Sequence, residues 1–200
     1  MLLDCRFDQP QLAAGLNWFN PPPQWQLQQG LQLTTGANTD LWQRTHYGFR
    51  RDDGHALLMA VAGDFEASVG VRFEPRQQYD QAGILLRIDS NNWVKASCEY
   101  EDDSLSRVGS VVTNLGYSDW ATSDLPSSVR QLHYRLSRRG DDVKLDFSHD
   151  GQRWQQMRIA HLHQAPKTVT VGPYACSPTG QDFRCTFDYF RVTENRWLCE

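Results

Sequence analysis

The stretch that decides the fold is YDQAGILLRIDSNNWVKASCEYE, residues 79–101. Two apolar runs flank a short turn rich in asparagine, which is typical of two antiparallel strands joined by a hairpin. In the second run an apolar set of side chains alternates with a mixed set: Val94, Ala96, Cys98 and Tyr100 against Trp93, Lys95, Ser97, Glu99 and Glu101. Because successive side chains of a strand point to opposite faces, we predict one packing face and one chemically mixed face.

The same period of two recurs along the chain. It is clearest in FEASVGVRF at residues 65–73. Three further runs show it: Leu132, Tyr134 and Leu136; Val143, Leu145 and Phe147; and Phe183, Cys185, Phe187 and Tyr189. Helical periodicity is sustained nowhere, so the sequence predicts an all-β protein built as a two-sheet antiparallel sandwich.

Three short segments place Gly beside Asp between apolar runs: RRDDGH (50–55), RRGDDV (138–143) and HDGQRW (149–154). Glycine readily adopts the positive φ that a tight hairpin needs, so each segment predicts a hairpin turn. The prolines at 21–23 interrupt the beginning of the chain between aromatic residues. We expect this segment to pack on the body of the protein as an irregular cover.

Length and composition bound the class of protein. A chain of 200 residues with 40% hydrophobic residues predicts a single domain over residues 1–200. The 20 basic residues are balanced by 24 acidic ones, so we expect no nucleic-acid partner. The beginning of the sequence, MLLDCRFDQPQ, has no sustained apolar stretch. It predicts neither a secretory signal nor an anchor, and hence a cytoplasmic protein without a membrane partner.

The cysteines and histidines do not form a recognisable ligand set. The five cysteines are odd in number and lack CxxC spacing, so we expect reduced thiols: Cys5, Cys98, Cys176, Cys185 and Cys199. Cys176 and Cys185 would pair only across neighbouring strands under oxidation, and we favour two small buried apolar side chains. His161 and His163 lack a third ligand at metal-binding spacing. The sequence predicts no metal and no cofactor.

The mixed face of residues 93–101 carries a ring, a cation and a carboxylate. At about 3.3 Å per residue, Trp93 and Glu99 lie roughly 20 Å apart, a length that suits an extended ligand such as a saccharide. The alternative is that Lys95 and Glu99 form cross-strand ion pairs with Arg87 or Asp89, and that Trp93 covers the sheet edge.

Three other segments favour the ligand site because each pairs polar with aromatic side chains. They are YDQAG with Asp80 and Gln81, TDLWQRTHYGF with Asp40, Trp42 and Tyr47, and NLGYSDWA with Ser118, Asp119 and Trp120.

In this order the motifs resemble a domain-of-unknown-function family of concanavalin A-like lectin and glucanase β-sandwiches, which includes regulation of enolase protein 1. The resemblance runs from about residue 12 to residue 192 and continues through VVTNLGYSDW, SHDGQRWQQMRI, ACSPTG and FDYF. It implies a jelly-roll sandwich with a ligand groove on its concave sheet. That groove is expected to hold Trp93, Lys95, Glu99, Thr113 and Arg158, with Trp42, Asp80, Gln81, Trp120 and Ser177 near its rim.

The strand at residues 93–101 also carries two carboxylates that bear on catalysis. Sandwich glucanases of the wider superfamily carry an E-x-D-x-x-E pattern, and this chain has EYEDD instead. Glu99 and Glu101 share a face at about 7 Å, which makes them candidate catalytic carboxylates. Against this, Glu101 adjoins two aspartates at a strand end, and Lys95 favours an ionised Glu99 where an acid catalyst needs a raised pKa. We favour a binding or structural role for Glu99.

Three hypotheses about function follow, in order of preference. The first is a ligand-binding sandwich that takes a carbohydrate or a related polyol, with Lys95 favouring an acidic sugar. The second is a protein-interaction or regulatory module that docks a partner chain on the same aromatic surface. The third is a glycoside hydrolase that uses Glu99 and Glu101.

Overall fold

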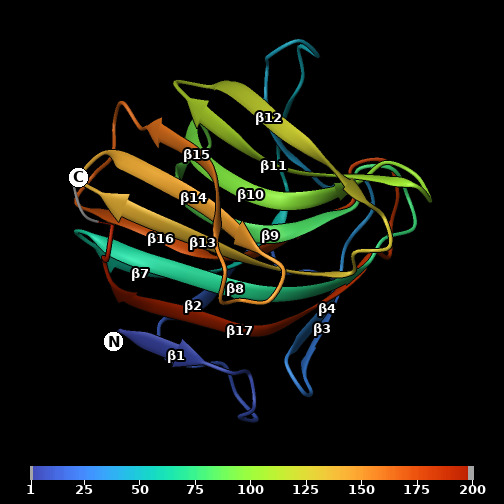
Figure 1. Cartoon of the computed structure of the whole chain (residues 1–200), viewed down its shortest axis with the longest axis horizontal. Helices are drawn as coiled ribbons and strands as arrows, with labels where there is room; N and C mark the ends of the chain where they lie inside the picture. The colour runs from blue at the N-terminus through green and yellow to red at the C-terminus, as the bar shows by residue number, and fades with distance from the viewer. Residues whose placement is uncertain (1, 198–200) are drawn as a thin grey trace.

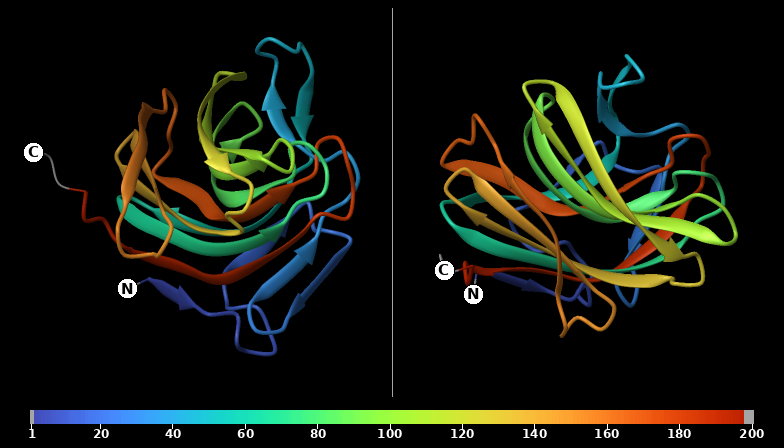
Figure 2. Two further views of the ribbon diagram at one scale, coloured as in Figure 1. Left: turned by 45° about the vertical axis from the view of Figure 1, so that its right-hand side comes forward. Right: turned by 45° about the horizontal axis from the view of Figure 1, so that its top comes forward.

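The protein is an all-β sandwich, as the alternating pattern predicted. The computed structural model describes residues 2–197, and within this range the chain forms 17 β-strands and no helix. The strands make two large antiparallel sheets, seen as two curved layers in Figures 1 and 2, and one separate hairpin. In this part of the chain no helical segment with the length and hydropathy of a membrane span is present.

The first sheet has eight strands in the order β15-β14-β13-β8-β17-β4-β3, with β1 paired to β17. These strands are β1 (Leu3–Cys5), β3 (Gln24–Leu27), β4 (Leu31–Thr34), β8 (Phe65–Glu74), β13 (Gln131–Arg139), β14 (Asp142–Ser148), β15 (Gln155–His161) and β17 (Arg184–Glu194).

The second sheet has seven strands in the order β12-β11-β10-β9-β16-β7-β2. These strands are β2 (Leu16–Phe19), β7 (His55–Ala62), β9 (Gln81–Asp89), β10 (Asn92–Tyr100), β11 (Leu105–Asn114), β12 (Tyr117–Pro126) and β16 (Thr168–Cys176). The separate hairpin, called the β5–β6 hairpin below, consists of β5 (Leu41–Gln43) and β6 (Arg50–Asp52).

The main core lies between the two sheets. The packing face of β10 contributes Val94, Ala96 and Cys98 to it, which confirms the predicted faces of this strand. Strands β8 and β13 of the other sheet contribute their alternating side chains: Phe65, Ala67, Val69, Val71, Phe73, Leu132, Tyr134 and Leu136. Burying apolar surface at about 25 cal/mol per Å² is the main force that holds such layers together, so this alternation accounts for the sandwich.

One predicted alternation breaks within β17. Phe187 is fully buried, but Tyr189 is not on the same face. A bulge between Phe187 and Tyr189 inserts one extra residue into the pairing with β8. Such an insertion moves the following side chains to the opposite face. Phe190 therefore takes the next core position, and the expected place of Tyr189 is corrected.

Two of the three predicted turns are hairpins. Gly140 and Gly151 have φ angles of 57° and 70° and join β13 to β14 and β14 to β15. Gly54 is different, because the strands on either side of it, β6 and β7, pair with other strands. A Cβ atom at Gly54 would lie 2.5 Å from the Cys176 sulfur, so close packing, not turn geometry, requires glycine there.

The cysteine prediction holds for the described residues. Cys5, Cys98, Cys176 and Cys185 are free thiols, while Cys199 lies outside the described residues. Cys176 belongs to β16 and Cys185 to β17, which are strands of different sheets, so the two do not lie across neighbouring strands. Burial raises the pKa of the Cys98 thiol to about 12. A thiol in such surroundings behaves as a small apolar side chain.

A second apolar cluster lies on the outer side of the seven-stranded sheet, beneath the β5–β6 hairpin. We call it the outer cluster, and its buried members are Leu41, Trp42, Ala56, Leu58, Leu85, Trp93, Val111, Tyr174 and Cys176. The hairpin is tied to the sheet by Gln43, whose backbone N–H donates to Ser118 Oγ at 2.9 Å. Leu41 and Trp42 of the hairpin therefore cover part of the mixed face of β10, while the rest of the hairpin projects from the molecule (Figure 2).

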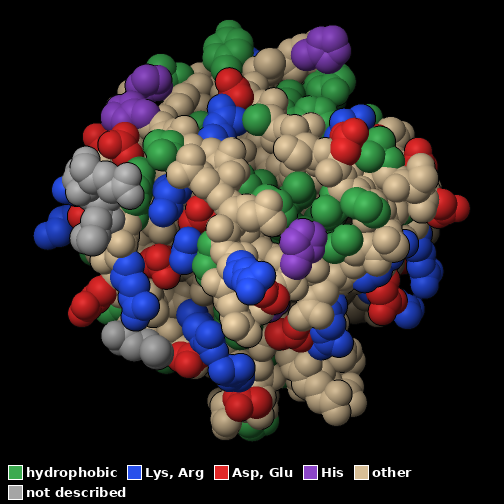
Figure 3. Space-filling view, in the orientation of Figure 1, with side chains coloured by type: hydrophobic (Ala, Val, Ile, Leu, Met, Phe, Trp, Pro, Cys, Tyr) green, Lys and Arg blue, Asp and Glu red, His purple; other side chains and the backbone are tan. Residues whose placement is uncertain are grey.

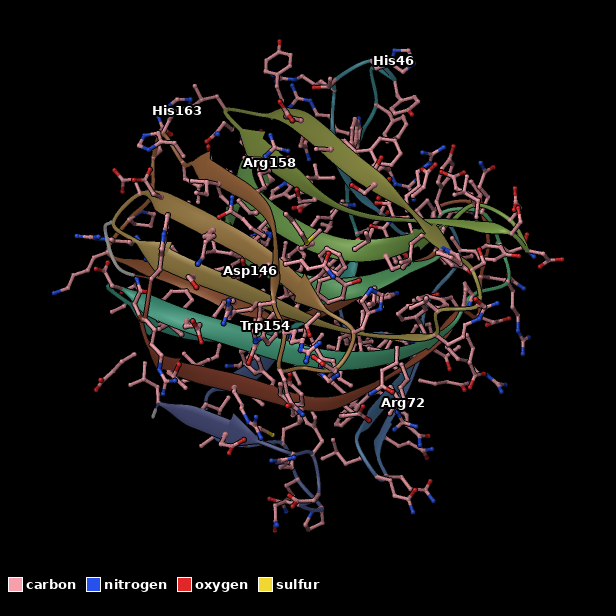
Figure 4. The ribbon with its side chains drawn as sticks, in the orientation of Figure 1. His46, Arg72, Asp146, Trp154, Arg158 and His163 are labelled. Atoms are coloured by element: carbon pink, nitrogen blue, oxygen red, sulfur yellow. The ribbon has the colours of Figure 1, made fainter. Side chains whose placement is uncertain are left out.

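The outer side of the eight-stranded sheet is solvated and charged. Arg135 pairs with Asp146 at 3.0 Å, and Lys144 lies 3.9 Å from the same carboxylate. Figure 3 shows basic and acidic side chains interspersed over this side, and Figure 4 marks Asp146 on β14. Alternating charges of this kind are ordinary for a solvated sheet face.

Candidate functional site

A pocket of about 460 Å³ opens beside the β5–β6 hairpin, on the outer side of the seven-stranded sheet. This volume is within the range of small-molecule sites. Aromatic side chains form much of its lining: Trp42, Tyr47, Phe49, Tyr79 and Trp120. Polar and charged side chains complete it: Asp40, Arg51, Gln81, Lys95, Glu99 and Thr179, together with Pro178.

Lys95 lies at the base of the pocket, with 2% of its surface exposed. Its Nζ atom donates to Gln81 Oε1 at 2.7 Å and lies 3.6 Å from Asp40 Oδ1. It is also 5.9 Å from the ring centroids of Trp93 and Tyr174, which support it from below. An ammonium group has three N–H donors. Within residues 2–197 the bond to Gln81 uses one and Asp40 lies beside the ammonium, which leaves at least one N–H for a ligand.

Glu99 lies further along the same face of β10 and is 7% exposed. Among the described residues its carboxyl group has no hydrogen bond and no ion pair within 4 Å. Burial raises the pKa of Glu99 to about 7, although the positive charge of Lys95 opposes the shift. Lys95 thus favours the ionised form as expected, but desolvation of the carboxylate by burial outweighs this attraction.

The aromatic wall is built by the turn of the β5–β6 hairpin. Trp42 Nε1 donates to the backbone oxygen of Thr45 at 3.0 Å, and the Trp42 and Tyr47 rings meet edge to face at 5.5 Å. Tyr47 also stacks on Phe49 at 5.6 Å. Three residues of this turn have positive φ: Arg44 (57°), His46 (62°) and Gly48 (76°). These conformations and ring contacts fix the wall in place.

Asp80 and Ser177 support the rim of the pocket from inside. Asp80 Oδ2 accepts bonds from the backbone N–H groups of Arg76 and Gln77 at 2.8 and 2.9 Å. Asp80 Oδ1 accepts the hydroxyl of Ser177, which is fully buried. These bonds hold Tyr79, a lining residue with a φ of 70°, in position. Neither Asp80 nor Ser177 faces the pocket, so their expected contact with a ligand is corrected to a supporting role.

The structure brings half of the predicted ligand residues together. The five that line the pocket are Trp42, Gln81, Lys95, Glu99 and Trp120. They come from three strands of the seven-stranded sheet and from the hairpin. The predicted meeting of an amine, a carboxyl group and aromatic rings is therefore found, although Trp93 is not among the rings.

Trp93 is the largest correction. Its side chain is fully buried in the outer cluster, and its indole N–H donates to the backbone oxygen of Ser90 at 3.3 Å. Leu41 and Trp42 of the hairpin pack over this end of the strand. The ring therefore offers no surface for a sugar to stack on, and its part in the site is to pack beneath Lys95.

Thr113 and Arg158 also lie away from the pocket. Thr113 is fully buried and bonds to Ser118 Oγ at 2.7 Å, so it anchors the residue that holds the hairpin. Arg158 belongs to β15 of the other sheet and donates to Asp119 Oδ1 at 2.6 Å. Figure 4 shows it between β15 and the strands β11 and β12.

The candidate catalytic pair is not assembled as expected. Glu101 accepts bonds from Arg107 Nε and Gln78 Nε2, each at 2.9 Å, and does not line the pocket. The two carboxyl groups that line it are Asp40 and Glu99. Any acid-base chemistry in this pocket therefore involves Asp40 in place of Glu101.

Sequence reasoning missed several lining residues: Phe49, Arg51, Tyr79, Pro178 and Thr179. Phe49 is the last residue of the motif TDLWQRTHYGF, and Arg51 lies two positions after it. Tyr79 directly precedes the predicted Asp80, and its aromatic ring next to an acidic turn residue was an available signal. Pro178 and Thr179 follow Ser177 in a loop whose path depends on long-range contacts.

Metal ligation finds no support within residues 2–197, where no group of three or more His, Cys, Asp or Glu side chains is placed to hold an ion. The His161 and His163 rings meet at 5.3 Å, and His161 Nδ1 lies 2.8 Å from Asp142 Oδ1. These three side chains lie on the exposed surface at the end of β15, where Figure 4 marks His163.

Solved structures place the fold among known sandwiches. A functionally unknown protein from Saccharomyces cerevisiae is 33% identical, with a TM-score of 0.84 over 90% of this chain and 97% of that chain. A GH43 protein, BlXynB from Bacillus licheniformis, is 20% identical, with a TM-score of 0.76 over 96% of this chain and 39% of that chain. At this identity the second likeness shows the fold alone.

Sequence comparison shows the family. The chain is 34% identical over 184 residues to regulation of enolase protein 1 of Saccharomyces cerevisiae, which covers 92% of this chain and 91% of that protein. Residues 18–195 match the model of a family described as protein of unknown function (DUF1349). The resemblance inferred from the motifs is thus confirmed, and the chain belongs to the DUF1349 family.

Proposed function

We propose that this protein binds a carbohydrate or a related polyol in the pocket between the β5–β6 hairpin and β10. The observation that carries the proposal is the unused hydrogen-bonding capacity at its base, where Lys95 has at least one free N–H donor and Glu99 has no hydrogen-bond partner in the described chain. A hydroxyl group both accepts and donates. Neighbouring hydroxyls of one sugar therefore accept from Lys95 and donate to Glu99.

The walls of the pocket suit the rest of such a ligand. Trp42, Tyr47 and Trp120 present aromatic surface next to these polar groups. A sugar ring has apolar C–H faces as well as hydroxyls, and sites with aromatic walls and a few convergent polar groups match both.

The charge of the pocket favours a neutral ligand. Two cations line it, and each has a carboxylate beside it: Asp40 lies 3.6 Å from Lys95, and Asp53 lies 3.0 Å from Arg51. These carboxylates offset the attraction that an acidic sugar would feel. We therefore expect neutral sugars to bind more tightly than uronic acids, in contrast to the preference expected from Lys95 alone.

The test is calorimetric titration after a glycan-array screen. Neutral and acidic glycans are compared on the wild type, Lys95→Met and the matched control Lys144→Met on the other sheet. Hydrogen bonds to charged groups contribute about 1.5–3 kcal/mol. Lys95→Met should therefore lower affinity roughly 10- to 100-fold, and Lys144→Met should leave it unchanged.

Two results would overturn the proposal. One is a screen in which no glycan binds, which leaves a protein-interaction module as the hypothesis to pursue. The other is a folded Lys95→Met protein that binds the same glycan with wild-type affinity.

Glycoside hydrolysis is a second candidate, favoured by one observation. Asp40 and Glu99 line the same pocket, and burial raises the pKa of Glu99 to about 7, a value suited to a general acid. Release of nitrophenol from a panel of nitrophenyl glycosides is measured for the wild type, Asp40→Asn and Glu99→Gln. Hydrolysis that persists unchanged in both variants would show that these groups are not its catalysts.

A further inference from the structure

A second hollow of about 360 Å³ adjoins the pocket on the far side of its aromatic wall. The two cavities share Trp42, Tyr47 and Trp120 as lining residues. A shared wall of side chains means that the two spaces are separated by little more than the rings themselves. A ligand that fills the pocket therefore lies next to the hollow.

The polar groups of the hollow come from the hairpin tip. Thr45 and His46 line it, and in the described part of the chain neither the Thr45 hydroxyl nor the His46 imidazole has a hydrogen-bond partner. Both residues are exposed, and Figure 4 shows His46 at the end of the hairpin. Like the pocket, the hollow therefore places polar groups with free hydrogen-bonding capacity next to aromatic rings.

The opposite side of the hollow is held by the edge strand β12. Asp119 lines it and is fixed by Arg158, which donates to Asp119 Oδ1 at 2.6 Å and to its backbone oxygen at 3.4 Å. Ser118 is fixed in turn by Thr113. Arg158 and Thr113, which were expected to touch the ligand, thus act as positioning residues for this strand.

The wall between the two cavities is held by contacts within the hairpin tip. Trp42 is anchored through its indole N–H to Thr45, and Tyr47 is held between Trp42 and His46 by edge-to-face contacts at 5.5 and 4.7 Å. Rings that are already ordered lose little conformational freedom when a ligand packs on them, so both sides of the wall are ready for contact.

We propose that the hollow is a second sugar subsite and that the ligand is an oligosaccharide of at least two units, one in the pocket and the next in the hollow. This inference rests on the proposed function, because the first unit occupies the pocket. It adds that recognition depends on chain length and that Thr45 and His46 contact the second unit.

The test compares sugars of increasing length by calorimetry. The probes are glucose, xylose, galactose and mannose with their β-1,4-linked disaccharides and trisaccharides. The variants are the double substitution Thr45→Val with His46→Gly, the deep-pocket variant Lys95→Met, and Thr122→Val as an exposed control on β12 outside both cavities. Glycine suits position 46 because the backbone there has a φ of 62°, and thermal unfolding checks that each variant is folded.

For the wild type we expect a disaccharide to bind at least tenfold more tightly than its monosaccharide. The double variant should lose this gain, which is measured as the ratio of the two affinities because loss of the His46 ring contact with Tyr47 also affects binding of the monosaccharide. Lys95→Met should weaken both probes, and Thr122→Val should change neither.

The possible failures are distinguishable. Equal affinities for the monosaccharide and the disaccharide, or a double variant that keeps the full gain, would overturn the second subsite and leave the pocket intact. A panel in which no sugar binds would overturn the proposed function, and the subsite with it.

Discussion

The two ends of one face of β10 differ in what covers them. At the beginning of β10, Trp93 is fully buried beneath the β5–β6 hairpin in the outer cluster. At the end of the same face, Glu99 lies in a pocket with no partner in the described chain. Both residues come from the same alternation, so the difference is made by the segment that crosses above them.

Apolar and acidic side chains on the outer face of a strand respond differently when another segment covers them. A large apolar side chain on an outer face becomes core as soon as another segment covers it, because burial of its surface is favourable. A carboxyl group in the same position is not covered without cost, since burial penalises its charged form. An uncompensated acid on a covered face therefore indicates a site more reliably than an aromatic ring does.

Truncating the buried ring at the covered end of β10 should cost the most stability. Trp93→Ala should lower the free energy of unfolding by about 3–5 kcal/mol, the usual cost of emptying a buried aromatic site. Trp120→Ala, which removes a half-buried ring from the pocket wall, should cost about 1 kcal/mol and should weaken sugar binding. Urea denaturation of both variants measures the two changes in the free energy of unfolding. Equal losses of stability would show that the two ends are not covered differently.

Glu99, at the uncovered end of β10, should make the stability of the protein depend on pH. The pKa of Glu99 is raised from 4.5 to about 7 in the folded protein. Between these values the folded protein keeps a proton that the unfolded chain releases, so this group makes stability fall as pH rises, and above about 7 its contribution is constant.

Glu99→Gln removes this titration. Relative to the variant, the wild type should lose roughly 3 kcal/mol of stability between pH 4 and pH 8, at about 1.36 kcal/mol per unit of pKa shift. Urea denaturation at several pH values, with Glu101→Gln as a control for the ion-paired neighbour, tests it. A constant difference between wild type and Glu99→Gln across this range would contradict the burial of an unpaired carboxyl group.

Two exposed tyrosines, one in the pocket wall and one outside it, should differ in their effect on sugar binding. Tyr47 is 51% exposed and lines the pocket, whereas Tyr117 is 59% exposed and lines neither cavity. Tyr47→Ala should change stability by less than about 0.5 kcal/mol and weaken sugar binding about 2- to 10-fold, as expected for a contact of about 0.5–1.5 kcal/mol. Tyr117→Ala should leave affinity unchanged in the same calorimetric titration. Matching losses would point to a general effect of surface aromatic residues.

Much of the fold follows from local sequence signals. The faces of β10 and the hairpins at Gly140 and Gly151 were predicted because alternation and turn residues act within a few positions. The bulge after Phe187 was not predictable, because an extra residue leaves the apolar residues in place and changes only their register. The role of Gly54 also escaped, since it depends on the distant Cys176.

The candidate site was less predictable for the same reason. Lys95 and Glu99 were found because they share a strand with a clear alternation. The burial of Trp93 depends on the hairpin at residues 41–52, which is separated from it by about 40 positions of chain and by no periodic signal. Similarly, the supporting bonds of Asp80 and Ser177 join segments that the sequence does not show to be neighbours.

The β5–β6 hairpin has a consequence for how this scaffold diversifies. Its two strands pair with each other and, in the described chain, with neither large sheet. Residues 44–49 at its tip can therefore be exchanged, lengthened or shortened without breaking a single ladder of the sandwich. The length and sequence of the tip are thus uncoupled from the strand pairing of the two sheets.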